Sequence, residues 1–343
     1  FLKIMFFVIA FLLGLMVRLL VLKNWELDRR MPVEIIAEIA NAHQGDPRMA
    51  ATLAERAFAA GADAVKFQVY FADELLVERH PRFAHFRDQA FDVETWAEVI
   101  PAAAEQGPVY CDVFGPRALA TAIAHGTAGV KVHSSDTSNM TLLHRVADTG
   151  CRVFLSAGGT TVRELQRAID VFAGGDTRPV LLHGFQSYPT QIESSNLARL
   201  AWLGENFDNV ADIGYADHVS GDDPFALILP AMALVYGIRV IEKHVTWDRS
   251  AQGVDYFSSI DVETLGAFVE TIRQAESAIG NVSSHFVPSE QTYRDSIKKH
   301  FVSASDLPAG HVLEAKDMDM KRVPDVTGDA VALEMLAGRE LLH

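Results

Sequence analysis

The chain has 343 residues, of which 49% are hydrophobic and 22% charged, so it holds enough apolar material for a sizeable core and disorder is excluded for most of it. Its 30 basic and 45 acidic residues give a formal net charge of −15, with no run of Lys or Arg, which excludes nucleic acid as the expected partner. The two cysteines show no CxxC spacing, which excludes a disulfide framework or zinc knuckle and fits a reducing compartment.

The first 22 residues, FLKIMFFVIAFLLGLMVRLLVL, are the compositional outlier. Only 14 uncharged residues separate Lys3 from Arg18, fewer than the roughly 20 that a spanning helix needs. No small-residue cleavage site of the signal-peptide type follows. Three interpretations of residues 1–30 stay open: an extension before a true start at Met31, a membrane or interfacial anchor, and a packed helix.

From Val33 onward, short apolar or β-branched runs alternate eight times with amphipathic helical stretches. Runs such as VIEKH and VFLSA are nearly continuous in hydrophobicity, as in parallel strands covered on both faces. No Gly-rich dinucleotide fingerprint occurs, which favours a closed (β/α)8 TIM barrel over residues 31–280 rather than an open doubly wound sheet. The expected strands are 33–40, 64–70, 108–113, 129–133, 152–156, 179–183, 210–215 and 238–244.

The helices carry their own boundary signals. Asp46-Pro47 is typical of an N-cap and first helical residue, and Gly61 stands where the same helix should end. Thr161 and Glu164 predict a capping box. Asp261 is expected to cap the last helix of the barrel.

Two further segments differ from this alternation. Residues 71–90, after the second strand, form a long His- and Arg-rich stretch that we interpret as a loop and a lid. Residues 281–295 are polar and predict a linker. Residues 296–343 are expected to form a small separate β-rich module that stops before it is complete.

The active site of such a barrel is built from the carboxyl ends of its strands, and nearly all of these ends are polar. Each buried polar group without a partner costs about 1–3 kcal/mol, so their convergence predicts a ligand site, although a single strand-end Lys or Ser is more often structural. The polar strand ends are Glu38, Asn41, His43, Lys66, Gln68, Lys131, His133, Ser134, Asp136, Ser156, His183, Gln186, Tyr188, Asp217, His218, Glu242, Lys243 and His244.

Four of these residues form the candidate anion site. Lys66 and Lys131, with the hydroxyls of Ser134 and Ser156, predict a cationic pocket rich in hydrogen-bond donors. Such a pocket suits a phosphate or a carboxylate in an otherwise acidic protein.

Two histidines form the candidate metal site. His218 and His244 are 26 residues apart, which is one βα unit and places them on neighbouring strands. Two imidazoles can bind one divalent ion and leave positions open for water and substrate. A hydrogen-bonded core histidine is an equally good interpretation of either residue.

The motifs VEIIAEIANAHQGD, GADAVKFQ, KVHSSDTSN, LSAGG, LHGFQSYPT, GYADH, VIEKHVTWDR and GVDYFSS resemble, in this order, those of the sialic acid synthase (N-acetylneuraminate synthase) family. The tail DLPAGHVLEAKDMDMKRVPD resembles the C-terminal antifreeze-like (SAF) domain of that family, so the resemblance covers about Val33 to His343. It implies a transferase that joins phosphoenolpyruvate to the open-chain aldehyde of N-acetylmannosamine or a related amino sugar. The products would be a nonulosonic, sialic-type acid and phosphate.

The resemblance also implies roles for single residues, in four sets: phosphoenolpyruvate binding, sugar binding, catalysis and a Mn²⁺ or Mg²⁺ site. The residues implied to bind phosphoenolpyruvate are Lys66, Lys131, Ser134, Ser156 and Gln186, and those implied to bind the sugar are Gln68, Tyr188, Asp255 and Arg322. The implied catalytic residues are Glu38, Asp136 and Glu242, and the implied metal ligands are His218 and His244. It further implies a domain-swapped homodimer in which Arg322 reaches the partner's sugar site. A cytoplasmic location is expected because phosphoenolpyruvate is a cytosolic metabolite.

Several positions depart from the family pattern. Asp136 stands where the family usually has Glu, which shortens the side chain by one methylene. Ala216 replaces the Ser of the usual SDH motif, and Ala157 replaces a Thr. Gln186 lies in an unusual HGFQ sequence, and the family's N-terminal hairpin is missing. The acceptor sugar is therefore not fixed by the resemblance.

Two other functions remain as alternatives. A barrel metallohydrolase would use the same two histidines to activate water, and Asp217 is the main candidate for its further metal ligand. A non-catalytic protein that binds or senses an amino sugar would have kept the fold after losing Ser at position 216. The first needs additional ligands near the metal, and the second predicts binding without phosphate release.

Overall fold

The computed structural model of the chain describes residues 32–184, 187–280, 285–323 and 333–340. The predictions made for residues 1–31 and for Gln186 concern residues outside these ranges. The chain divides into two compact units, Phe1–Gly280 and Asn281–His343, and each is considered by itself.

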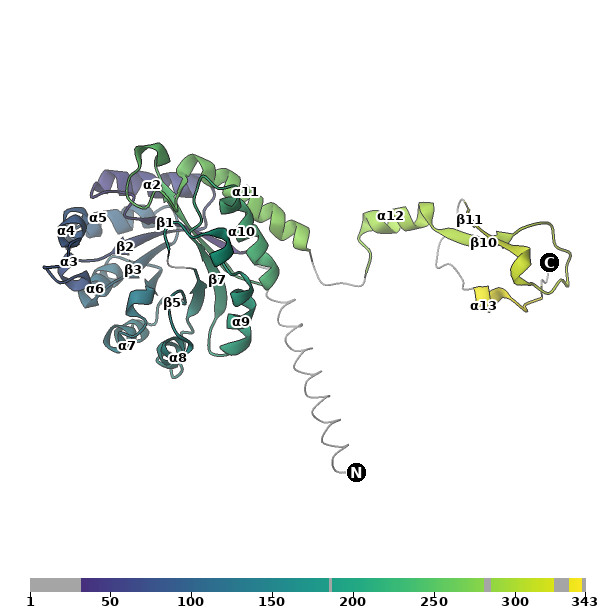
Figure 1. Ribbon diagram of the computed structural model, residues 1–343, viewed down its shortest axis with the longest axis horizontal. Coiled ribbons are helices and arrows are strands. Elements are labelled where there is room, and N and C mark those ends of the chain that lie inside the picture. The colour runs from purple at the N-terminus through teal and green to yellow at the C-terminus, as the bar shows by residue number, and fades with distance from the viewer. Residues whose placement is uncertain (1–31, 185–186, 281–284, 324–332, 341–343) are drawn as a thin grey trace, which may run out of the picture. The chain divides into compact units, whose positions relative to one another are not determined.

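The first unit is a closed barrel of eight parallel strands, each hydrogen-bonded to its sequence neighbour and closed by pairing of the first strand with the eighth (Figure 1). Every predicted strand overlaps an observed one, and the predicted TIM barrel is confirmed. A short ninth strand, β9 (Ile260–Asp261), pairs with the end of the eighth. The barrel strands are β1 (Glu34–Ala40), β2 (Ala64–Val69), β3 (Val109–Val113), β4 (Gly129–Val132), β5 (Arg152–Ser156), β6 (Val180–His183), β7 (Asp212–Asp217) and β8 (Val240–Thr246).

Helices follow the strands and form the outer layer of the barrel (Figure 1). The Asp46 side chain caps the first of them by accepting from the backbone N–H of Arg48, and Thr161 and Glu164 form the predicted capping box. The helices are α2 (Pro47–Ala59), α3 (Ala72–Leu75), α4 (Phe83–Gln89), α5 (Val93–Ala104), α6 (Pro116–Ala124), α7 (Met140–Asp148), α8 (Val162–Asp170), α9 (Ala198–Asn206), α10 (Phe225–Ala233) and α11 (Val262–Ile279).

Asp261 does not cap α11 in the predicted way. It occupies the N-cap position, but its side chain makes no hydrogen bond to the helix. Its Oδ1 accepts instead from the backbone N–H of Arg249, at 2.6 Å. Because β9 pairs with β8, Asp261 is held beside the loop that follows β8, and its carboxylate serves that loop.

Residues 71–90 are not the irregular loop that the sequence predicted. They contain α3 and α4, and α4 packs the edge of the Phe86 ring against Tyr70, with 5.5 Å between ring centroids. The guanidinium of Arg117, on α6, lies 3.9 Å from the centroid of Phe71. These aromatic contacts order the segment. Its function as a lid stays a prediction.

The inward face of the barrel changes from apolar to charged along several strands, among them β1, β3 and β8. On β1, Ile36 is followed two residues later by Glu38, and on β8 Val240 is followed by Glu242 and His244, which share a face because side chains alternate along a strand. The apolar part seals one end of the barrel and leaves the polar part at the carboxyl ends. It comprises Ile36, Ala64, Tyr110, Phe154, Val180, Leu182, Ala216 and Val240.

The second unit is small, and none of its residues 285–323 and 335–340 is buried. Strands β10 (Lys299–Ser303) and β11 (Met318–Arg322) pair antiparallel, and α13 (Leu333–Leu336) follows them. Helix α12 (Pro288–Ile297) begins inside the stretch predicted as a linker, because Pro288 suits the first helical position. Within the described part of the chain, no helix combines the length and apolar character that crossing a bilayer requires.

Candidate active site at the carboxyl ends of the barrel strands

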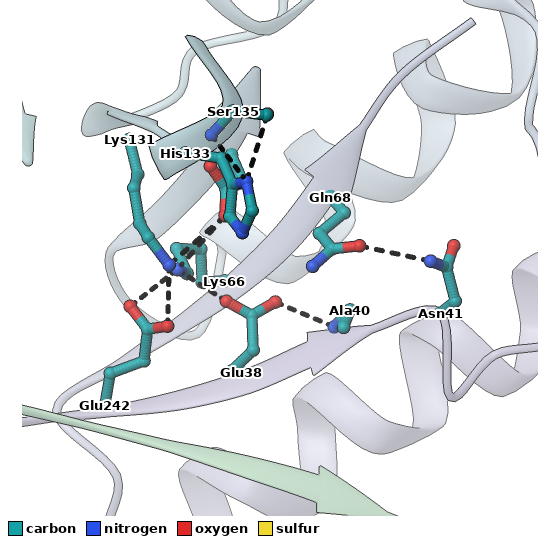
Figure 2. Close-up of polar contacts among 10 residues, drawn as sticks. Glu38, Ala40, Asn41, Lys66, Gln68, Lys131, His133, Ser135 and Glu242 are labelled. Atoms are coloured by element: carbon teal, nitrogen blue, oxygen red, sulfur yellow. Dashed lines mark hydrogen bonds and ion pairs between the residues drawn. The ribbon is translucent and has the colours of Figure 1, made fainter. Parts of the chain in front are cut away.

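Five buried charged side chains from β1, β2, β3, β4 and β8 meet inside the barrel. Lys66 Nζ lies 2.5 Å from Glu38 Oε2 and 2.6 Å from Glu242 Oε2. Lys131 Nζ lies 2.8 Å from the other oxygen of Glu242, and Figure 2 shows Glu242 bridging the two lysines. Asp112 Oδ2 lies 3.3 Å from Lys131 Nζ and 3.6 Å from Lys66 Nζ. We call these five residues the charge cluster.

The charge cluster holds three carboxylates against two ammonium groups. Burial raises the pKa of Glu38 to about 7, although Lys66 opposes this effect. Burial would also raise the pKa of Glu242, but Lys131 and Lys66 hold it well below its ordinary value. A proton on Glu38 makes the cluster neutral. The two lysines of the predicted cationic pocket are thus paired with carboxylates, and an anion beside them is favoured when Glu38 is protonated.

The end of β1 fixes the direction of Glu38. The strand register shifts between Glu38 and Ala40, and Ala40 adopts φ +46°, which turns its backbone N–H inward. That N–H donates to Glu38 Oε1 at 2.8 Å. The next residue, Asn41, donates its side-chain amide to Gln68 Oε1 at 3.1 Å (Figure 2). Its Oδ1 accepts from the Tyr70 hydroxyl at 2.9 Å.

The raised pKa of Glu38 predicts how stability depends on pH. The folded chain keeps a proton on Glu38 up to about pH 7, whereas the ordinary Glu pKa is 4.5. The stabilising contribution is thus complete below pH 4.5 and is lost as the pH rises through 7. Relative to Glu38→Gln, the wild-type free energy of unfolding in urea should fall over this interval and stay constant above it. No change in this difference between pH 4.5 and 7 would mean that Lys66 keeps Glu38 ionised.

Two neutral imidazoles lie next to each other at the same end of the barrel. The rings of His218 and His244 are 5.2 Å apart between centroids, and both side chains are buried. Burial lowers the pKa of His244 to about 3 and that of His218 well below its ordinary value. The Nδ1 atom of each ring is buried and has no hydrogen-bond partner among the residues that the structure describes. Neutral imidazoles with unpartnered nitrogens fit a divalent metal ion that takes its other ligands from water and substrate.

Asp217 does not join this pair. It is fully buried, Lys243 Nζ lies 2.5 Å from its Oδ2, and the Tyr215 hydroxyl donates to its Oδ1 at 2.9 Å. Over the described ranges, no group of three or more His, Cys, Asp or Glu side chains is placed to hold a metal ion. The metallohydrolase alternative therefore loses the carboxylate on which it depended.

A cavity of about 470 Å³ opens beside the histidine pair. Of the residues that the resemblance assigns to the sugar, Gln68, Tyr188 and Asp255 line it, as does His244. Burial raises the pKa of Asp255, so this carboxyl is less readily ionised than an exposed one. The other residues of the wall are Asn41, Tyr70, Leu75, Arg82, His85, Phe86, Phe114, His133, Ser135, Val254 and Phe257.

Asp136 lies apart from this wall. It ends a short 3-10 helix, Ser134–Asp136, and its carboxylate accepts from Ser135 Oγ at 2.9 Å and from Asn139 Nδ2 at 3.0 Å. It does not line the cavity. The structure thus places Asp136 in the turn after β4, where its carboxylate is hydrogen-bonded to neighbouring residues of the same turn.

The remaining candidates are placed differently from one another. Ser134 is half-buried at the start of the same 3-10 helix, and Ser156 is buried at the end of β5. Arg322 is exposed on β11 in the second unit, and Gln186 lies outside the described residues. Asp112 was missed because it lies inside the apolar run VYCDV. Its alternation with the inward-facing Tyr110 is the signal that could have found it.

Comparison with known proteins gives consistent matches. Residues 53–284 match the NeuB family. The N,N'-diacetyllegionaminic acid synthase of Legionella pneumophila is 27% identical over 337 residues, which cover 90% of this chain and 93% of that protein. The N-acetylneuraminate-9-phosphate synthase of Homo sapiens is 27% identical over 85% of this chain and 83% of that protein. The N-acetylneuraminic acid synthetase of Leptospira borgpetersenii superposes with a TM-score of 0.71 at 29% identity, covering 78% of this chain and 93% of that chain.

Proposed function

Because this chain belongs to the NeuB family, we propose that it is a transferase that forms a carbon-carbon bond between phosphoenolpyruvate and the aldehyde of an N-acetylated amino sugar. The products are a nonulosonic acid and phosphate. The observation that carries this function is the charge cluster beside two neutral histidines, at the mouth of a barrel that opens into a cavity of about 470 Å³.

Each part of the site has a task in this reaction. Phosphoenolpyruvate lies beside Lys66 and Lys131, where a proton on Glu38 offsets the surplus negative charge. The sugar occupies the cavity, with its hydroxyl and acetamido groups towards Gln68 and Asp255. Holding both substrates in contact supplies several kcal/mol of the barrier reduction, on the order of 7 kcal/mol when alignment is good.

The bond changes follow from this placement. The π electrons of phosphoenolpyruvate form the new bond from C3 to the aldehyde carbon, and the aldehyde oxygen takes up a proton. Water adds to the electron-poor C2 and loses a proton. The C2–O bond to phosphate then breaks, while the new C2 hydroxyl becomes the carbonyl group and gives its proton to the leaving phosphate. Glu38 is the proton carrier that the charge cluster offers for these steps, whereas Glu242 stays ionised between the two lysines.

His218 and His244 are the residues that would hold Mn²⁺ or Mg²⁺. When bound there, the ion would supply Lewis-acid polarisation of the aldehyde oxygen. The imidazoles contribute by staying neutral, since burial keeps both pKa values low.

The second unit is proposed to be an antifreeze-like domain that completes the site of a partner in a domain-swapped homodimer. None of residues 285–323 and 335–340 is buried, and Tyr293, Val312 and Met335 are among the exposed apolar side chains. A unit of this size without a core needs another surface for stability. Arg322 is the residue expected to reach the partner's sugar. The cytoplasm is the proposed compartment, because phosphoenolpyruvate is made there.

A phosphate-release assay tests the function directly. The full chain is incubated with phosphoenolpyruvate and a panel of 2-acetamido aldoses, with and without Mn²⁺. Release is expected with at least one sugar and is expected to depend on Mn²⁺. Phosphoenolpyruvate alone is the control. Sugar binding without release from any member of the panel would support the non-catalytic sensing protein instead.

A further inference from the structure

The loop after β8 forms one wall of the cavity, and two of its non-glycine residues have unfavourable backbone conformations. Val254, Asp255 and Phe257 line the cavity. Gln252 and Asp255 adopt φ values of +51° and +61°, in the left-handed region that disfavours residues with a side chain. Each such residue costs on the order of 1 kcal/mol or more, so contacts from outside must hold the loop in place.

Arg249 supplies these contacts. Its side chain is only 9% exposed, and its Nη1 donates to the backbone carbonyl oxygens of Tyr256 and Ser259. Its Nη2 lies 2.5 Å and its Nε 3.3 Å from the carboxylate of Asp222, in the loop between β7 and α10. Its backbone N–H donates to Asp261. One planar guanidinium therefore joins both sides of the cavity loop to a neighbouring loop, a geometry that a lysine ammonium does not reproduce.

Gly221 leaves the space that this guanidinium occupies. A Cβ atom at this position would lie 2.4 Å from Arg249 Nη1 and 1.9 Å from the backbone oxygen of Ser259. Neither approach is tolerated, so any side chain at position 221 must displace the guanidinium or the loop. The position offers a way to disturb the contacts of Arg249 without changing Arg249.

We propose that Arg249 is a positioning residue that sets the affinity for the sugar acceptor by fixing residues 253–259 around Asp255. Arg249 itself does not line the cavity, and among the described residues none of its hydrogen bonds or ion pairs reaches the charge cluster or the histidine pair. Its loss thus changes the sugar wall and leaves the phosphoenolpyruvate side intact. This inference rests on the proposed function.

Steady-state kinetics of Arg249→Lys test the proposal. The KM for the sugar should rise at least about tenfold, while kcat and the KM for phosphoenolpyruvate stay within about threefold of the wild type. Gly221→Ala should give the same pattern. Asp222→Asn should give a weaker one, because the Asp222 side chain is 83% exposed. The double variant Arg249→Lys/Asp222→Asn should be no worse than Arg249→Lys, since both changes remove one contact.

Arg273→Lys is the matched control. Its guanidinium likewise binds one backbone oxygen, that of Val33, and two carboxylates, those of Glu276 and Asp63. These contacts lie beside the start of β1. It should lower stability without separating the two KM values. The proposal is overturned if Arg249→Lys raises both KM values equally or leaves the sugar KM unchanged. If Arg249→Lys does not fold, the same outcomes with Asp222→Asn decide. A wild-type chain without phosphate release would instead refute the proposed function.

Discussion

Replacing Lys66 by Met is expected to lower the free energy of unfolding of the barrel by about 3–5 kcal/mol. The Lys66 ammonium is fully buried and lies within 3.6 Å of Glu38, Asp112 and Glu242. Without it, three buried carboxylates share the single charge of Lys131. Urea denaturation followed by circular dichroism at pH 8 measures the loss.

The pH dependence and a surface variant control this result. At pH 5 the destabilisation should be smaller, because Glu38 already carries a proton below its pKa of about 7. Arg87→Met removes an ion pair with Asp88 in which both side chains are more than half exposed, and it should cost less than about 1 kcal/mol. A Lys66→Met chain as stable as the wild type at pH 8 would contradict the charge cluster.

The sequence predicted the fold because each strand can be recognised from its own short apolar run. Eight apolar runs separated by amphipathic helices are sufficient for a barrel, and the hydrogen-bonded neighbours follow from chain order. The capping box at Thr161 was equally local. The hydrogen bond of Asp261 was not predictable from local sequence. Its carboxylate accepts from the backbone N–H of Arg249, which lies beside it because β8 pairs with β9.

The site was less predictable, because side-chain direction and register decide it. Asp217 and His218 are adjacent in sequence, yet one residue turns a side chain to the other face of the sheet. Asp217 therefore meets Lys243 under the helices, while His218 meets His244 inside the barrel. The two lysines, Glu38 and Glu242 were recognised as site residues, but their pairing was not, and Asp112 was missed.

The ion pairs of Lys66 show why the sequence did not predict these contacts. Glu38 and Asp112 come from the two strands that flank β2, and Glu242 comes from β8. Only the closed barrel, in which β1 pairs with β8, brings these chain-distant carboxylates together. No local pattern at Lys66 encodes them, so the sequence alone predicted a cationic pocket without these ion pairs.

Replacing His244 by Ala is expected to reduce phosphate release at least about 100-fold and to abolish Mn²⁺ binding. The Nδ1 atoms of His244 and His218 have no protein partner, and a single remaining imidazole is too few protein ligands for a stable site. Electron paramagnetic resonance of Mn²⁺ titrated into the purified chain measures binding independently of turnover. Urea denaturation checks that the variant is folded.

His183→Ala is the matched control for a buried imidazole. His183 also ends a barrel strand, but its Nε2 is hydrogen-bonded to the backbone oxygen of Ser195 at 2.9 Å, and it does not line the cavity. Its removal should cost stability and leave Mn²⁺ binding unchanged. If His244→Ala bound Mn²⁺ like the wild type and kept full activity, the imidazole pair would be a packing feature, and the metal would have to be held by other groups.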